Sequence, residues 1–162
     1  MKKFLPIKRK QKTSKSQKEE TKKFEGFRGK VYRDSAGHET IGYGHKVTAK
    51  EKRQGTFKGR TITKKEADKI FEKDLQAAED CVRRHVRVKL TQGQFDALVD
   101  FVFNVGCGKF AKSTLLKKLN GGNYKAVPKE LMKWNKVRKK GKLVTSPGLT
   151  RRRKAEVKRW KQ

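Results

Sequence analysis

A glutamate, an aspartate and a threonine stand at a spacing that could perform acid–base chemistry on a sugar polymer. Glu25 is followed by eight residues and then Asp34, and a further five residues separate Asp34 from Thr40. Glycosidic cleavage needs one protonated carboxyl group to donate to the leaving oxygen and one ionised carboxylate to direct water or stabilise positive charge. A neighbouring hydroxyl group can hold the water. A helix-terminal glutamate and a turn aspartate are also common structural residues, so spacing alone leaves the catalytic interpretation open.

The elements around these residues would bring the two carboxylates together. A helix-forming segment over 18–24 is followed by Gly26, a residue suited to stop a helix. β-branched and aromatic residues within 31–45 flank a turn that begins at Asp34, which predicts a hairpin. A helix that reverses into a hairpin would set Glu25 close to this turn.

The rest of the chain is predicted to be mainly helical. Thr63 with Glu66 and Thr91 with Gln94 form capping-box patterns at the start of apolar residues with helical spacing. Segment 46–62 has two glycines and no helical period, so we expect loop and short strand there. Helices are expected at 64–84, in a central and most apolar segment after Thr91, and at 112–119, 124–134 and 147–160.

These elements predict an α+β fold that is mostly helical. A small hairpin-bearing lobe at about 24–62 and a larger helical lobe at about 63–162 would form one domain over 18–162. Residues 1–17 are rich in Lys, Ser, Thr and Gln and are predicted to form a flexible basic tail.

Charge is the dominant feature of the composition. The 162 residues include 46 Lys or Arg and 16 Asp or Glu, so the formal net charge is +30. Nucleic acid, anionic membrane surfaces, lipopolysaccharide and anionic wall polymers would all attract such a chain, although charge also serves solubility. No apolar run approaches the roughly 20 residues of a membrane span, and the stretch 4–7 is too short for a secretory signal. We expect a cytosolic product that needs help to leave the cell.

Several ordered segments match one known family. Glu25-Gly26, the run 31–34 and the run 37–45 reproduce a pattern of Glu, eight residues, Asp, five residues and Thr, followed by Ile-Gly-x-Gly-His. On these residues the sequence resembles the bacteriophage lysozymes, or endolysins. The resemblance extends over about 20–160 through segments 92–98, 103–106, 113–116 and 147–156.

The resemblance implies a lysozyme-like fold with a cleft between its lobes. It implies hydrolysis of the β-1,4 bond between N-acetylmuramic acid and N-acetylglucosamine in peptidoglycan, with inversion of configuration and without a metal or cofactor. Glu25 would be the general acid, and Asp34 with Thr40 would position the attacking water. The enzyme would be made in the host cytoplasm and reach the wall during phage-driven lysis through a membrane-permeabilising protein.

Three further residues are candidates for substrate binding. Asn104 could bind sugar hydroxyl groups, or it could simply end the central helix. Arg151 or Arg152 could reach back to pair with Glu25, as a carboxy-terminal arginine does in the family, or both could belong to a solvated basic face.

Other conspicuous side chains are given structural interpretations. Tyr43 and Trp134 are expected to be packing residues rather than sugar platforms. The three histidines show no His-Glu-x-x-His run, so no metal site is expected. Cys81 and Cys107 could come into contact, but two buried free thiols are favoured for a cytosolic chain.

Two other classes of function compete with the enzyme. One is a cationic protein that binds the envelope or disrupts membranes without catalysis, and the other is a nucleic-acid-binding module. No groove-reading motif is visible and the aromatic residues follow predicted core positions, so no specific nucleic acid is expected. The expected partners are peptidoglycan and, through the Lys-rich tail, the anionic envelope surface, with the chain acting as a monomer.

Overall fold

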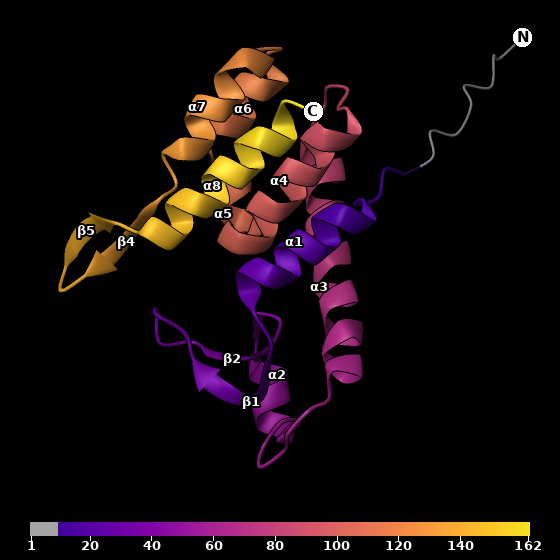
Figure 1. The fold of residues 1–162 in the computed structure, drawn as a ribbon, viewed down its shortest axis with the longest axis vertical. Helices are drawn as coiled ribbons and strands as arrows, with labels where there is room; N and C mark the ends of the chain where they lie inside the picture. Colours follow the sequence, from indigo (N-terminus) through magenta and orange to yellow (C-terminus); the bar gives the residue numbers. More distant parts are fainter. Residues whose placement is uncertain (1–9) are drawn as a thin grey trace, which may run out of the picture.

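The computed structural model describes residues 10–162 and divides them into two lobes. In Figure 1 the small lobe lies below and contains the strands β1 and β2 with helix α2. The larger lobe lies above and is built almost entirely of helices, with α3 running along one side of the molecule and down to the small lobe. The predicted α+β, mostly helical organisation is confirmed.

The helical lobe is organised around one buried helix. Helix α4 carries buried side chains at every position from Phe95 to Val102, and it packs against α3 and α8. A helix that is apolar around most of its circumference is stable only when other helices cover it. The helices of this lobe are α1 (Lys15–Glu25), α3 (Lys64–His85), α4 (Gln92–Val105), α5 (Cys107–Ala111), α6 (Thr114–Asn120), α7 (Val127–Met132) and α8 (Pro147–Trp160), with a short 3₁₀ helix (Tyr124–Ala126) before α7.

Local capping residues set the ends of the long helices. The capping boxes predicted at Thr63 and Thr91 are both formed, and each threonine side chain accepts a hydrogen bond from the backbone three residues later. Helix α1 ends at Gly26, whose φ of 72° lies in the left-handed region that favours glycine. The helices expected near 64–84 and 147–160 are therefore confirmed almost to the residue.

The small lobe holds an antiparallel sheet of three strands in the order β1-β2-β3. These are β1 (Arg28–Arg33), β2 (Glu39–Gly42) and β3 (His45–Lys46). The predicted hairpin is present, and Tyr32 of β1 lies opposite Thr40 of β2. A separate small core beneath the sheet consists of Ile41, Phe57, Ile62 and Ala67.

The expectation of loop and strand over 46–62 missed helix α2 (Ala49–Gln54). This helix buries none of its residues, so it shows no apolar period in the sequence. Its start is nevertheless encoded locally, because Thr48 and Glu51 form a third capping box. A second hairpin, β4 (Lys136–Lys139) with β5 (Lys142–Thr145), was not predicted either and projects from the helical lobe (Figure 1).

The prediction of a flexible tail over 1–17 is wrong for residues 10–17. Helix α1 begins at Lys15, and the side chains of Thr13 and Gln17 are buried. The backbone N–H and hydroxyl group of Thr13 both donate to Glu79 at 2.7 Å, and the backbone N–H of Ser14 donates to Asp96 at 2.9 Å. Polar residues that pair with buried carboxylates leave no hydropathy signal. The remainder of the predicted tail, residues 1–9, lies outside the described residues.

The expectation of two free thiols is also wrong. Cys81 on α3 and Cys107 at the start of α5 form a disulfide, with their Cα atoms 5.9 Å apart. That separation is ordinary for a disulfide. The prediction used the redox state of the cytosol, whereas the pairing follows from the path of the chain, which returns after α4 to the last turns of α3.

Candidate active site

Glu25 lies at the junction of the two lobes, as the last residue of α1. Its side chain is 17 % exposed, and its carboxylate lies against the backbone of Gly44 in the turn between β2 and β3. A Cβ atom at position 44 would overlap this carboxylate, and Gly44 has a φ of 72°. Glycine is thus required at this position both for the close approach and for the backbone conformation.

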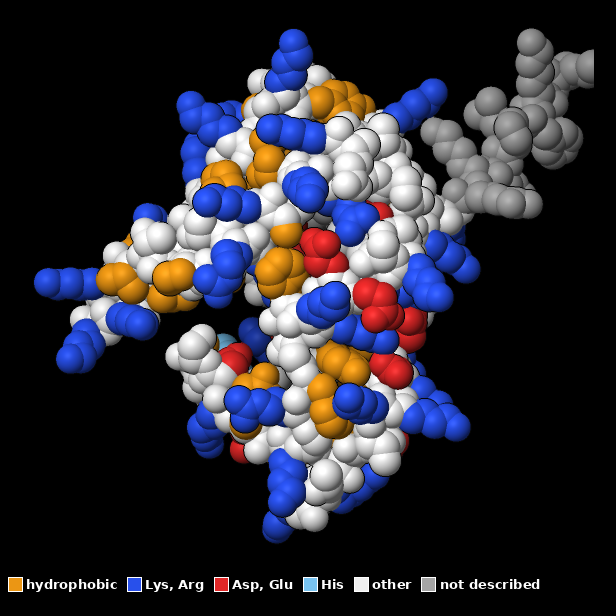
Figure 2. All heavy atoms as spheres, in the orientation of Figure 1, with side chains coloured by type: hydrophobic (Ala, Val, Ile, Leu, Met, Phe, Trp, Pro, Cys, Tyr) orange, Lys and Arg blue, Asp and Glu red, His pale blue; other side chains and the backbone are white. Residues whose placement is uncertain are grey.

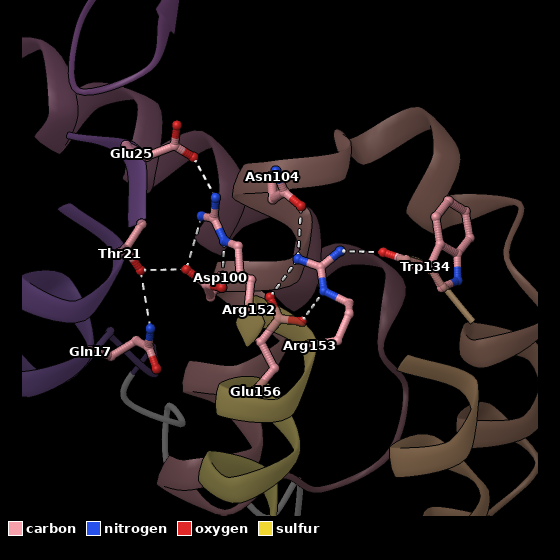
Figure 3. A network of polar contacts seen from close by, with 9 residues as sticks. All are labelled: Gln17, Thr21, Glu25, Asp100, Asn104, Trp134, Arg152, Arg153 and Glu156. Atoms are coloured by element: carbon pink, nitrogen blue, oxygen red, sulfur yellow. Dashed lines mark hydrogen bonds and ion pairs between the residues drawn. The ribbon is translucent and has the colours of Figure 1, made fainter. Parts of the chain in front are cut away.

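A buried arginine holds Glu25 from the other end of the chain. Nη1 of Arg152, on α8, donates to Oε1 of Glu25 at 2.7 Å. The same guanidinium group donates through Nε and Nη2 to the two oxygens of Asp100 at 3.0 and 3.1 Å (Figure 3). Such a two-point contact fixes the plane of the guanidinium group, and with it the position of the carboxylate of Glu25.

Asp100 is in turn held by helix α1. The hydroxyl group of Thr21 donates to Oδ1 of Asp100 at 2.7 Å, and the amide of Gln17 donates to Thr21 at 3.1 Å. Burial alone would raise the pKa of Asp100, but the charge of Arg152 and the surrounding hydrogen bonds hold it well below the usual range. Asp100 is therefore ionised, and the positive charge of Arg152 is shared between two carboxylates.

A second buried arginine holds Asn104. Nη2 of Arg153 donates to Oδ1 of Asn104 at 2.7 Å and to Glu156 at 2.9 Å, and Nη1 donates to the carbonyl of Trp134 at 3.3 Å (Figure 3). Burial, together with the hydrogen bond and charge of Asp100, raises the pKa of Glu156. Asn104 is thus fixed through its carbonyl oxygen, which leaves its amide NH₂ group as the donor that could meet a ligand.

The predicted alternatives for the two arginines are separated by burial. Arg152 is 5 % exposed and directs its donors to Glu25 and Asp100, so it makes the pairing with Glu25 that was predicted for one of the two arginines. We propose that it positions Glu25 rather than binding a sugar. Arg151 is exposed and makes no contact with Glu25. A single-residue shift along the helix turns the side chain by about 100°, which is why the neighbours differ.

Asp34 lies at the end of β1 and heads the hairpin turn. Its Oδ1 accepts hydrogen bonds from the backbone N–H groups of Ala36 at 2.9 Å and His38 at 2.8 Å. Slight burial raises the pKa of Asp34, but these two hydrogen bonds outweigh it, so the pKa lies below its usual value. Asp34 is therefore an ionised carboxylate held by the backbone. The hydroxyl group of the buried Thr40 donates to the carbonyl of His38 at 2.9 Å.

A cavity of about 330 Å³ lies between the lobes. Gly44 and His45 border it from the small lobe, and Phe103 and Asn104 border it from the end of α4. Glu25 lies against Gly44, which lines this space, but Glu25, Asp34 and Thr40 are not themselves among the lining residues. Figure 2 shows that the surface is also hollowed between the small lobe and the β4–β5 hairpin.

His45 fastens the cavity wall to two helices. Its Nδ1 lies 2.8 Å from Asp74 on α3, and its Nε2 lies 2.9 Å from Glu51 on α2. The hydrogen bond to Asp74 raises the pKa of His45 most strongly, burial opposes it, and Glu51 adds to the rise, which brings the pKa to about 9. The imidazole is thus a cation at neutral pH. Sequence reasoning gave this histidine no role.

Two aromatic residues have the packing positions expected of them. The ring of Tyr43 lies between those of Phe27 and Phe71, with centroid distances of 5.7 and 6.0 Å. The ring of Trp134 packs edge-on against Phe101 at 5.3 Å. Both contacts belong to the hydrophobic core rather than to an open sugar platform.

A helical lobe, a small antiparallel sheet and an acidic residue at their junction define a lysozyme-like glycoside hydrolase. The chain belongs to the phage lysozyme family, whose family model matches residues 22–156. Among curated proteins, an endolysin of Acyrthosiphon pisum secondary endosymbiont phage 1 is 40 % identical over 135 residues, which cover 83 % of this chain and 88 % of the relative. The endolysin of Salmonella phage P22 is 42 % identical over 118 residues, or 73 % of this chain and 80 % of the relative.

Solved structures agree with the sequence relatives. The muramidase domain of SpmX from Asticaccaulis excentricus has a TM-score of 0.81 at 32 % identity and covers 93 % of this chain and 98 % of its own. An endolysin from Escherichia coli O157:H7 phage FAHEc1 has a TM-score of 0.78 at 34 % identity, with 97 and 96 % coverage. The predicted family and fold are confirmed. Within residues 10–162, every helix falls short of the length or apolar character needed to cross a bilayer.

Sequence reasoning missed the residues that hold Arg152 in place beside Glu25. Asp100 carried a usable signal, because it interrupts the most apolar stretch of the chain with a carboxylate. A charged residue in such a stretch is rarely buried without a partner. Thr21 and Gln17 carried no comparable signal, since a polar residue on a short surface helix is ordinary.

Proposed function

We propose that this protein hydrolyses the β-1,4 bond between N-acetylmuramic acid and N-acetylglucosamine in peptidoglycan, with Glu25 as the general acid. The observation that carries the proposal is the position of Glu25 at the junction of the lobes, where Arg152 holds its carboxylate against Gly44, a residue that lines the cavity. Only Oε1 is bound to Arg152, so Oε2 is the oxygen that would donate a proton to the leaving sugar.

Asp34 and Thr40 are assigned the role of positioning and activating the water molecule that attacks the sugar. An ionised carboxylate accepts the proton of a water molecule as it attacks, and a threonine hydroxyl group can orient that water. The lowered pKa of Asp34 keeps it in the required state at neutral pH. In this assignment the water attacks the face of the sugar opposite to the leaving group, and the product has inverted configuration. Asn104, which borders the cavity, is assigned a hydrogen bond to a sugar hydroxyl group.

The biological setting is proposed from the relatives. Proteins described as endolysins match most of this chain, which supports action on the bacterial cell wall during phage-driven lysis. Release from the host cytoplasm by a separate membrane-permeabilising protein, action as a monomer and the lack of a specific nucleic-acid partner remain predictions. The charge of +30 supports attraction to the anionic envelope.

The test is the substitution Glu25→Gln, which preserves shape and removes the acid. We expect turnover on purified peptidoglycan to fall on the order of 10²- to 10⁴-fold, since a positioned general acid contributes about that factor. Glu19→Gln is the matched control, because Glu19 is exposed on the same helix. Circular dichroism and thermal melting would show that both variants fold.

The products distinguish the enzyme from its rivals. Hydrolysis releases reducing muramic-acid ends, whereas anhydro-muramic ends would indicate a lytic transglycosylase. A Glu25→Gln variant that lyses cells as well as the parent chain would support the non-catalytic cationic alternative. The first-formed anomer, followed by proton NMR on a soluble fragment, reports inversion or retention.

A further inference from the structure

Three potential metal ligands meet where the last turns of α3 lie beside the start of α5. Cys81 and His85 are four residues apart on α3, so their side chains leave the same face of the helix. Cys107, the disulfide partner of Cys81, is the first residue of α5. One ligand atom from each of the three residues lies within 4.8 Å of the others. Over the range 10–162 this is the only cluster of three or more His, Cys, Asp or Glu residues with that geometry.

The lone pairs of two of these ligands converge on one small volume. Arg84 donates through Nη2 to Sγ of Cys107 at 3.6 Å and through Nε to Nε2 of His85 at 3.5 Å. Both acceptors therefore face the same guanidinium group, which places Sγ of Cys107 and Nε2 of His85 around one small volume. Arg84 is exposed, so its side chain can turn into solvent and vacate this volume.

We propose that reduction of the disulfide converts Cys81, His85 and Cys107 into a Zn²⁺ site, with a water molecule as the fourth ligand. Two thiolates and one imidazole are the ligand types that Zn²⁺ prefers, and three protein ligands with one open position is an established arrangement. The proposal is independent of the glycosidase assignment.

The backbone is already spaced for this change. Tetrahedral zinc with sulfur ligands at about 2.3 Å would separate the two sulfur atoms by roughly 3.7 Å. In the disulfide form the Cα atoms of the two cysteines lie 5.9 Å apart. Rotation about the two Cα–Cβ bonds can move the sulfur atoms apart without a change in this Cα separation.

The metal-bound and disulfide states exclude each other. A phosphine reductant donates two electrons to the S–S bond and is itself oxidised to the phosphine oxide. One water molecule supplies the oxygen of the phosphine oxide and the protons of the two thiols. Binding of Zn²⁺ then releases these two protons. The exchange takes place at the wall of the cavity between the lobes, because Cys107 also lines that cavity.

The experiment measures binding of Zn²⁺ alone to the full chain in its two redox states. The protein is reduced with a phosphine, desalted without oxygen and titrated with Zn²⁺ against a chromophoric chelator. We expect about one equivalent to bind to the reduced protein and none to bind at this site in the disulfide form. Bound Zn²⁺ should also raise the melting temperature of the reduced protein in a concentration-dependent way.

Variants test the ligands. His85→Gln and Cys107→Ser should each weaken binding to the reduced protein at least tenfold, whereas His38→Gln, which replaces an exposed histidine elsewhere, should leave it unchanged. Co²⁺ bound to the reduced parent chain should give a thiolate-to-metal charge-transfer band. This measurement does not depend on whether any variant folds. Failure of the reduced chain to bind Zn²⁺, equal binding by His85→Gln, or absence of the charge-transfer band would each overturn the proposal.

Discussion

At the scale of single residues, the decisive feature is the ion pair that fixes Glu25. Its partner, Arg152, stands 127 positions later in the sequence and is itself fixed by both oxygens of Asp100. A carboxyl group that must donate a proton in one direction needs a fixed orientation, and loss of such orientation costs rate even when the group itself is present. The arginine therefore contributes geometry rather than contact with the sugar.

Replacement of Arg152 by lysine should separate charge from geometry. Arg152→Lys keeps a positive charge but cannot donate to Glu25 and to both oxygens of Asp100 at once. We expect kcat on a soluble peptidoglycan fragment to fall about 10- to 100-fold with little change in KM, because the side chain does not touch substrate. Arg151→Lys, one position away and exposed, should behave like the parent chain. A larger effect on KM than on kcat would argue for direct sugar binding.

At the scale of elements, two polar links hold segments that the hydrophobic core does not reach. His45 joins β3 to both α2 and α3, and Thr13 joins the segment before α1 to α3. Helix α2 buries no residue of its own, so the contact between His45 and Glu51 is a main attachment of that helix. Because His45 titrates, its contacts make the stability of the small lobe depend on pH.

The link through His45 should weaken in alkaline solution. The pKa of His45 is about 9 in the folded chain and near 6.5 when unfolded. The stabilisation is therefore fully present below about pH 6.5 and is lost as the pH rises through 9. We expect His45→Gln to lower the free energy of unfolding by on the order of 2 kcal/mol at pH 6 and by much less at pH 10. Urea unfolding at several pH values measures this, with His38→Gln as control.

The link through Thr13 tests whether residues 10–17 belong to the folded domain. Thr13→Val removes the hydroxyl group that donates to the buried carboxylate of Glu79. We expect a loss of about 0.5–1.5 kcal/mol in the free energy of unfolding, since an intramolecular hydrogen bond typically contributes about that much. The same substitution at Thr61, which is exposed, should have little effect. If Thr13→Val were as stable as the parent chain, the segment 10–17 would not contribute to the stability of the folded domain.

At the scale of the whole molecule, we expect the charge of +30 to govern the encounter with the wall rather than the reaction. Basic side chains cover much of the face in Figure 2, including the projecting β4–β5 hairpin. That hairpin carries Lys or Arg at Lys136, Arg138, Lys139, Lys140 and Lys142, with the exposed Leu143 beside them. A positive surface raises the local concentration of the protein at an anionic polymer through a field that salt screens over about 8 Å at physiological ionic strength.

Salt should therefore affect cells and small substrates differently. We expect activity on whole cells to fall steeply with ionic strength, whereas turnover on a short neutral oligosaccharide should change little. Removal of residues 2–9, which include four Lys or Arg, should make the salt dependence on cells shallower and leave oligosaccharide turnover intact. The truncation stops before residue 10 because residues 10–17 are packed against the helical lobe. Parallel salt curves for both substrates would contradict this view.

The sequence by itself determined the features that depend on neighbours within about four residues. The capping boxes at Thr63 and Thr91, the stop at Gly26 and the hairpin around Asp34 were predicted and are present. These features depend on hydrogen bonds between a residue and the backbone about three positions away, so the local sequence is enough to predict them. The pattern of Glu25, Asp34 and Thr40 can likewise be read from the sequence, although it spans residues 25–40, and its catalytic roles stay a prediction.

Only the tertiary structure decided which distant side chains meet. It selected Arg152 over Arg151 as the partner of Glu25, buried Asp100 between them and joined Cys81 to Cys107. It also brought Thr13 to a carboxylate 66 positions away. The physical reason is that a polar or sulfur-bearing side chain has the same local preferences whether it is exposed or paired. Its partner is fixed by the path of the helices, which packing of the whole core determines.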